Sequence, residues 1–203
     1  MTEQTHDRWL LMIYRVPQEP PGRRTYVWRH LRQLGAVYLQ QAAAILPDRA
    51  ELRSGLDALR QRILEFGGDV SLLETRSPDP SWEADLLARF NSAREAEYAE
   101  VAENVERFED EIRRERRRGR FSFAQLEDIE ADWEKLQRWH ERIQRRDFFG
   151  ASVRAATELA LTRGQAELEA FAAEVCTREG AEIGGAVLGA DDRSANESPG
   201  PAD

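Results

Sequence analysis

The sequence predicts an α+β head followed by a helical extension, and three observations indicate this. An apolar run of strand length lies near the N-terminus, from Arg8 to Pro17. Helix-like and strand-like segments then alternate as far as residue 80. Beyond Pro80 the composition changes, and every pattern to about Cys176 is helical.

The opening apolar run is expected to be a central strand. Its residues are rich in aromatic and β-branched side chains, and Pro17 ends it because proline has no N–H for a ladder and fixes φ. Too few positions are polar for a strand with one solvated face. We therefore expect this strand to be covered on both sides.

A loop rich in proline and a helix follow the strand. Residues 17–22 contain three prolines and a glycine, which is typical of a loop. From Arg23 to Leu34 the apolar residues Val27, Leu31 and Leu34 recur at helical spacing. Gly35 can adopt the left-handed conformation that ends a helix.

The rest of the head is expected to supply three strands and a second helix. We expect two short strands at 36–40 and 43–46 with a break near Gln41, although one continuous strand is the alternative. Asp48 is expected to cap a helix that runs to about Phe66. A strand at 70–75 completes the order β-α-β-β-α-β. That order is the ferredoxin-like plan, in which two helices cover one face of an antiparallel sheet.

Three helices are expected in the extension. The first, 81–118, has near-heptad apolar spacing of the kind found in coiled coils, and Gly119 ends it. Ser122 and Gln125 form a capping box for the second helix, which should pack antiparallel to the first. A third helix is expected at 151–176. The predicted domains are therefore the head, 1–80, the helical extension, 81–176, and a disordered tail, 177–203.

Composition limits the classes of function. The charge is unevenly distributed: residues 1–76 carry 11 Arg and 9 Asp or Glu, whereas residues 77–203 carry 18 Lys or Arg and 29 Asp or Glu. If part of the chain meets nucleic acid, the front part is the better candidate. No apolar stretch is long enough for a membrane span, there is no secretory signal, and Cys176 is the single cysteine. These features predict a cytoplasmic protein with no membrane partner.

Arginines of the head form the first candidate site. They flank the first strand, its loop and the first helix, and guanidinium groups suit planar contact with phosphate or guanine. The alternative is an ordinary solvated face whose arginine stems cover aromatic rings. The candidate DNA contacts are Arg15, Arg23, Arg24, Arg29 and Arg32.

A denser basic run ends the first long helix and forms a weaker candidate site. It could hold an oxyanion. The alternative is a helix terminus where cations suit the dipole, with Glu109 and Asp110 one turn earlier. The candidate oxyanion ligands are Arg113, Arg116, Arg117 and Arg120.

Motifs of the common enzyme classes are absent from the sequence. It contains no phosphate loop, dinucleotide fingerprint, nucleophile elbow or zinc-ligand spacing. The three histidines and Cys176 are not spaced as metal ligands. We therefore expect a protein without catalysis, cofactor or metal.

Several long segments resemble the N-terminal domain family of ChrB, the chromate-resistance regulators. They are Trp9–Pro17, Arg23–Arg29, Leu34–Gln40, Phe121–Ala124 and Arg146–Ala151. The resemblance covers roughly residues 8–175. It implies a bacterial cytoplasmic regulator of transcription whose basic residues in this region contact promoter DNA. Full-length members continue into a second domain linked to the chromate response, so we expect the sensor to be a separate chain or to be absent.

The sequence thus predicts a regulator-like, DNA-binding protein, with a homodimer as a possible assembly. One alternative is a helical interaction or scaffold protein without DNA binding. Another is an accessory protein that binds an oxyanion such as chromate through the Arg113–Arg120 run. The operator, the inducer and the oligomeric state do not follow from the sequence.

Overall fold

The computed structural model describes residues 8–191, and the side chains of residues 8–179. The chain divides into two compact units. Within the described residues, the head unit consists of residues 8–99 with Glu141–Arg154, and the helical unit consists of Glu100–His140 with residues 155–191. The sequence analysis puts a domain boundary at residue 80. In the structure a long helix, Pro80–Arg118, begins there and contributes residues to both units.

The head contains a four-stranded antiparallel sheet with the strand order β2-β3-β1-β4. Together with two helices, the chain order is β-α-β-β-α-β, so the predicted α+β, ferredoxin-like head is confirmed. The helix from Arg23 to Leu34 has the bounds expected from the sequence. The elements are β1 Arg8–Arg15, α1 Arg23–Leu34, β2 Val37–Gln40, β3 Ala43–Pro47, α2 Ala50–Glu65 and β4 Asp69–Arg76.

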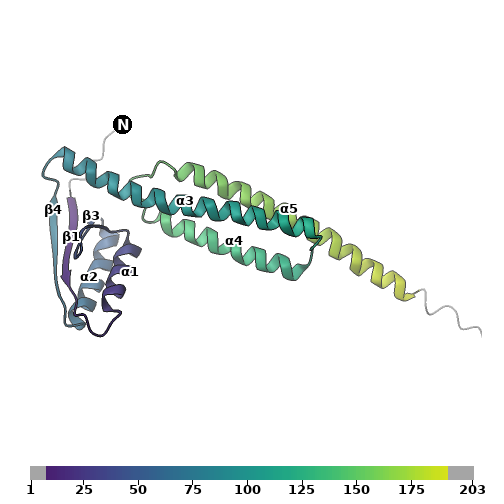
Figure 1. Cartoon of the computed structure of the whole chain (residues 1–203), viewed down its shortest axis with the longest axis horizontal. Helices are drawn as coiled ribbons and strands as arrows, with labels where there is room; N and C mark the ends of the chain where they lie inside the picture. The colour runs from purple at the N-terminus through teal and green to yellow at the C-terminus, as the bar shows by residue number, and fades with distance from the viewer. Residues whose placement is uncertain (1–7, 192–203) are drawn as a thin grey trace, which may run out of the picture. The chain divides into compact units, whose positions relative to one another are not determined.

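Helices α1 and α2 cover one face of this sheet (Figure 1). The core between them follows the two periodicities of the sequence: alternate residues of β1 meet every third or fourth residue of each helix. Burial of these apolar side chains is the main favourable term that holds the layers together. The fully buried side chains here are Leu10, Met12, Val27, Leu31, Leu46, Leu56 and Ile63.

The other face of β1 is covered along only part of its length. Trp9 is fully buried against Leu86 and Phe90 of α3, Pro80–Arg118, and its ring stacks on that of Phe90 at 5.7 Å. Further along β1, Ile13 is 44% exposed. The strand is therefore central, as expected, but it is covered on both sides only at its beginning.

The start of α2 differs from the expected cap. Arg49, not Asp48, precedes the helix, and no side chain caps it. The Asp48 carboxylate instead accepts two hydrogen bonds from Arg53, at 2.8 and 2.6 Å. A bidentate ion pair thus replaces the cap, because the guanidinium of Arg53 satisfies both carboxylate oxygens.

The helical unit packs α3, α4 and α5 side by side, with α3 and α4 antiparallel (Figure 1). Helix α4, Phe123–Gln144, begins as expected after Ser122, whose hydroxyl oxygen accepts the N–H of Gln125 at 3.2 Å. Rings of Phe108 and Trp133 lie 4.8 Å apart and join the first two helices of this unit. The predicted helical extension is therefore present.

Helix α5 is longer than expected. It runs from Arg154 to Asp191, whereas the sequence analysis puts its end at Cys176 and a disordered tail at 177–203. The chain is helical through the first part of that segment, and residues 192–203 lie outside the described residues. Among the described helices, none has a stretch of the length and apolar character that a membrane crossing requires.

Candidate functional site

The five candidate arginines of the head have different surroundings. Arg23 is held by the backbone: it donates to the carbonyl oxygens of Glu19 at 3.0 Å and Phe66 at 2.9 Å. Its guanidinium also lies 5.4 Å from the centre of the Phe66 ring. Arg23 therefore joins the loop before α1 to the end of α2, and these two contacts use the donors of one guanidinium nitrogen, Nη1.

Arg32 is partly neutralised. Its guanidinium lies 3.8 Å from a carboxylate oxygen of Glu97 on α3, within the head unit. It also lies over the ring of Trp28, 5.4 Å from the centre. The side chain remains 55% exposed, so this pair is weak in solvent and leaves the guanidinium accessible.

Arg24 and Arg29 are exposed on α1, and the described residues form no ion pair with either. Arg24, Trp28 and Arg32 succeed one another at intervals of four, so they form one row along the helix. Arg29 lies beside that row. The solvent side of α1 thus carries Arg24 and Arg32 in one row, with Arg29 next to Arg32, three residues earlier.

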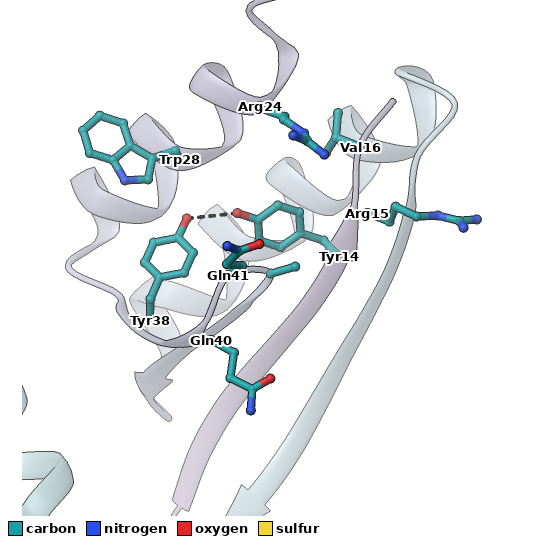
Figure 2. A pocket seen from close by; sticks show the side chains of 9 residues that line it. Tyr14, Arg15, Val16, Arg24, Trp28, Tyr38, Gln40 and Gln41 are labelled. Carbon is teal, nitrogen blue, oxygen red and sulfur yellow. Dashed lines mark hydrogen bonds between the residues drawn. The ribbon is translucent and has the colours of Figure 1, made fainter. Parts of the chain in front are cut away.

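The side chain of Arg15 points away from the arginines on α1 (Figure 2). Figure 2 shows its side chain pointing away from Tyr14, its neighbour in β1. Successive side chains of a strand point to opposite faces, and Tyr14 faces the helices. Arg15 is exposed, but its guanidinium does not join the row on α1.

An open pocket of about 750 Å³ lies beside the row on α1. Trp28, which is 44% exposed, forms one wall, and Arg24 extends along the same side toward Val16 (Figure 2). The hydroxyl oxygens of Tyr14 and Tyr38 lie 3.0 Å apart and share a hydrogen bond. The pocket is lined by Tyr14, Arg15, Val16, Arg24, Trp28, Tyr38, Gln40, Gln41 and Ala42.

Tyr38 is held in its neutral form. Burial raises the pKa of Tyr38 well above its ordinary value, and the hydrogen bond shared with Tyr14 raises that pKa further. Both effects oppose the phenolate form. Tyr38 therefore stays a hydroxyl at physiological pH, able to donate and to accept a hydrogen bond.

Strand register creates this pocket. Ala44 of β3 pairs with Met12 on one side and with Tyr38 on the other, so Tyr38 lies two strands from β1 on the face toward the helices. An irregularity in the β2–β3 pairing follows Tyr38; Gln40 ends β2, and Gln41 lies in the turn after it. The chemistry of the pocket therefore comes from elements that the sequence separates.

Sequence reasoning missed Trp28, Tyr38 and the two glutamines as site residues. The one available signal was that Trp28 is a large aromatic residue outside the apolar stripe of α1. No local sequence pattern identifies Tyr38 as a site residue, because it lies in a strand whose partners are set by tertiary structure.

The basic run at the end of α3 is partly neutralised within the helical unit. Arg116 pairs with Glu167 at 2.6 Å and Glu174 at 3.0 Å, both on α5. The outer members pair with carboxylates of α3: Arg113 with Asp110 at 3.1 Å, and Arg120 with Glu115 at 3.9 Å. Arg117 is exposed beside a shallow pocket that is also lined by Arg107, Asp110 and Arg114.

The pocket beside α1 presents groups that can bind a ligand. None of its nine lining residues is a carboxylate, and none is a histidine or cysteine. The described residues contain no group of three or more His, Cys, Asp or Glu side chains suited to a metal ion. What the pocket presents is a guanidinium group, aromatic rings, amides and hydroxyl groups.

Comparison with known proteins adds two findings. A sequence model of the family described as "Protein ChrB, N-terminal" matches residues 24–182. Protein ChrB of Cupriavidus metallidurans (strain ATCC 43123 / DSM 2839 / NBRC 102507 / CH34) is 34% identical over 92 residues. That alignment covers 45% of this chain and 28% of the relative, so the chain matches little more than a quarter of that protein. Because the family match extends over more than half of the chain, the chain belongs to the family of ChrB N-terminal domains.

Proposed function

We propose that the chain binds DNA through the outer face of α1 and acts in transcriptional regulation linked to chromate resistance. Membership of the ChrB N-terminal family supports the association with chromate resistance. The charges on α1 support the DNA-binding part of the proposal.

The observation that carries the proposal is the contrast between the two basic groups. In the run on α3, Arg113, Arg116, Arg118 and Arg120 are paired with carboxylates, and Arg114 and Arg117 share a pocket with Asp110. Arg24 and Arg29, in contrast, project from α1 without an ion pair among the described residues. Guanidinium groups that are not neutralised bind phosphate through charge-assisted, often bidentate, hydrogen bonds. The arginines on α1 are thus the better candidate for a site that binds a polyanion.

Net charge predicts that this binding is sensitive to salt. The chain carries a formal charge of −9, so the protein as a whole repels DNA, and attraction comes from a local patch. Binding through a few phosphate contacts weakens as salt rises, because counterions released from DNA must be replaced. We expect modest affinity that is measurable at low salt.

The test is a salt titration of DNA binding. The probe is a labelled duplex from the region upstream of the gene, followed by fluorescence anisotropy. The variant Arg24→Ala/Arg29→Ala removes two exposed guanidinium groups from α1. The control Arg114→Ala/Arg117→Ala removes two exposed arginines from the helical unit and changes the net charge equally.

The two variants should behave differently. Loss of two phosphate contacts should lower the slope of log affinity against log salt by about 2 and weaken binding at low salt. The control should bind like the wild type. Equal losses in both variants, or no binding by the wild type at low salt, would refute the proposal.

A further inference from the structure

The pocket beside α1 is concave, and this shape bears on what kind of DNA it can meet. Duplex sequence is read by elements that protrude into a groove, and the major groove is about 12 Å wide. Gln40, Gln41 and Tyr38 lie in the walls of a hollow instead. Side chains in the walls of a hollow are poorly placed to read base edges that are stacked inside a duplex. A base that leaves the stack can reach them.

The size of the pocket fits a single nucleotide. Its volume of about 750 Å³ falls within the range of small-ligand sites, roughly 300–1,000 Å³. Trp28 offers a partly exposed indole at the wall, and every nucleobase has a π-face that can stack on such a ring. An aromatic residue exposed beside a pocket is therefore a natural contact for a base.

Hydrogen-bonding groups surround the space next to that ring. Each glutamine amide offers two donors and one acceptor, which is the complement that base edges require. Tyr14 and Tyr38 together carry two O–H donors, and their shared bond uses one of them. The other donor is available to a ligand, since it bonds to no further group in the part of the chain that the structure describes.

The charge of the pocket also suits a nucleotide. Arg24 lines the same pocket and lies one helical turn before Trp28. A base stacked on Trp28 carries its phosphate within the reach of a nearby guanidinium group, and no lining residue is acidic. An aromatic ring beside a cation is the combination that single-stranded nucleic acids bind.

From these features we infer that the Trp28 pocket receives one unpaired base of DNA, with its phosphate on Arg24. The preferred partner is therefore DNA that contains an unstacked or single-stranded nucleotide. This inference rests on the proposed DNA binding and names the form of DNA that the same surface selects.

The test compares three DNA probes of equal length and sequence: a duplex, the same duplex with one bulged nucleotide, and a single strand. The variant is Trp28→Ala, and Trp28→Phe restores a stacking ring. Leu64→Ala is the control, because Leu64 is 45% exposed in the same unit and lies outside the pocket. Thermal unfolding of each variant checks that it is folded.

The bulged and single-stranded probes should bind about tenfold more tightly than the duplex. Trp28→Ala should remove that preference, Trp28→Phe should restore most of it, and Leu64→Ala should keep it. If wild type binds all three probes equally and Trp28→Ala changes nothing, the pocket inference is wrong while the proposed function stands. If wild type binds none of the probes at low salt, both are wrong.

Discussion

The hydroxyl groups of Tyr14 and Tyr38, 3.0 Å apart, form a hydrogen bond between two strands that do not pair with each other. Tyr14 lies in β1 and Tyr38 in β2, and β3 separates them. The bond therefore depends on the strand order, and it positions two polar groups inside the candidate site.

Replacement of Tyr14 by Phe should lower the pKa of Tyr38 toward its ordinary value near 10. It should not restore that value fully, because burial, the larger cause of the shift, remains. Ultraviolet absorbance during a pH titration measures tyrosine ionisation. Tyr26→Phe is the control, since it removes one tyrosine without removing the bond to Tyr38.

The same raised pKa predicts the sign of a pH effect on stability. Below pH 10, Tyr38 is protonated in both the folded and the unfolded chain, and its contribution does not change. As pH rises above about 10, the unfolded chain loses this proton and the folded chain retains it. The free energy of unfolding should then fall with pH, and it should fall less steeply in Tyr14→Phe. An equal decline in both proteins would contradict this account.

Glu97 is the centre of a buried charge cluster in the head unit, and its replacement by Gln should be strongly destabilising. Its carboxylate lies 3.2 Å from both Arg94 and Arg146 and 3.8 Å from Arg32. Burial lowers the pKa of Arg94 and of Arg146, and Glu97 opposes that shift. Without the carboxylate, buried guanidinium groups are unpaired, which costs about 3–5 kcal/mol.

Urea unfolding measures this cost. The control is Glu65→Gln in the same unit, where Glu65 and Arg62 form an exposed pair at 2.6 Å. Solvent screens that pair, so its loss should change the unfolding midpoint little. Similar losses in Glu97→Gln and Glu65→Gln would show that the buried cluster contributes nothing special.

Gly35 ends α1 with φ of 86° and is packed against the segment after α4. An added Cβ would lie 3.0 Å from the Arg146 Cβ and 3.0 Å from the Phe148 ring. Gly35→Ala therefore adds a close contact to the left-handed backbone strain of roughly 1–2 kcal/mol. At Gly67, with φ of 73°, an added methyl group would have nothing within 4 Å, so Gly67→Ala should show the strain alone.

We expect Gly35→Ala to lose more unfolding free energy than Gly67→Ala, by about 1 kcal/mol or more, as typical of overpacking. Chemical denaturation of the two variants under one set of conditions gives this difference. If both lose the same amount, the segment around Phe148 can move away from α1 without cost.

Gly164 of α5 lies beneath the Trp133 ring in the helical unit. A Cβ there would lie 2.6 Å from the nearest ring atom and 3.1 Å from a methyl carbon of Val105. Alanine usually stabilises a helix interior relative to glycine by about 1 kcal/mol. Here Gly164→Ala should destabilise by about 1–3 kcal/mol, because the large indole cannot yield easily.

A double-mutant cycle with Trp133→Phe tests the cause. The smaller ring leaves room for the added methyl group, so the double variant should be more stable than the sum of the single effects predicts. Additive effects would mean that Trp133 is not the group that resists the methyl.

Local pattern is sufficient to predict most elements of this fold. Helix α1 is predicted at 23–34 because Val27, Leu31 and Leu34 repeat at helical spacing and Gly35 ends them. The predicted end of α5 at Cys176 is wrong, since the helix continues to Asp191. The predicted cap at Asp48 is also wrong, because Arg53 competes for its carboxylate.

The candidate site is harder to predict from the sequence than the fold is. Arg23 and Arg24 are neighbours of the same type, yet Arg23 is bound to the carbonyl oxygen of Phe66, 43 residues away, and Arg24 lines the pocket. No local pattern separates the two. Likewise, the run near Arg116 is denser in basic residues than α1, but two carboxylates of α5 lie beside Arg116 and pair with it.

The sequence by itself determined the elements, their order and the ferredoxin-like plan, because periodicity, turns and helix ends depend on neighbouring residues. Only the tertiary structure decided which arginines stay unpaired and which side chains line the pocket beside Trp28. The physical reason is that ion pairing and concavity arise between residues that are distant in the chain, and strand order and register bring them together.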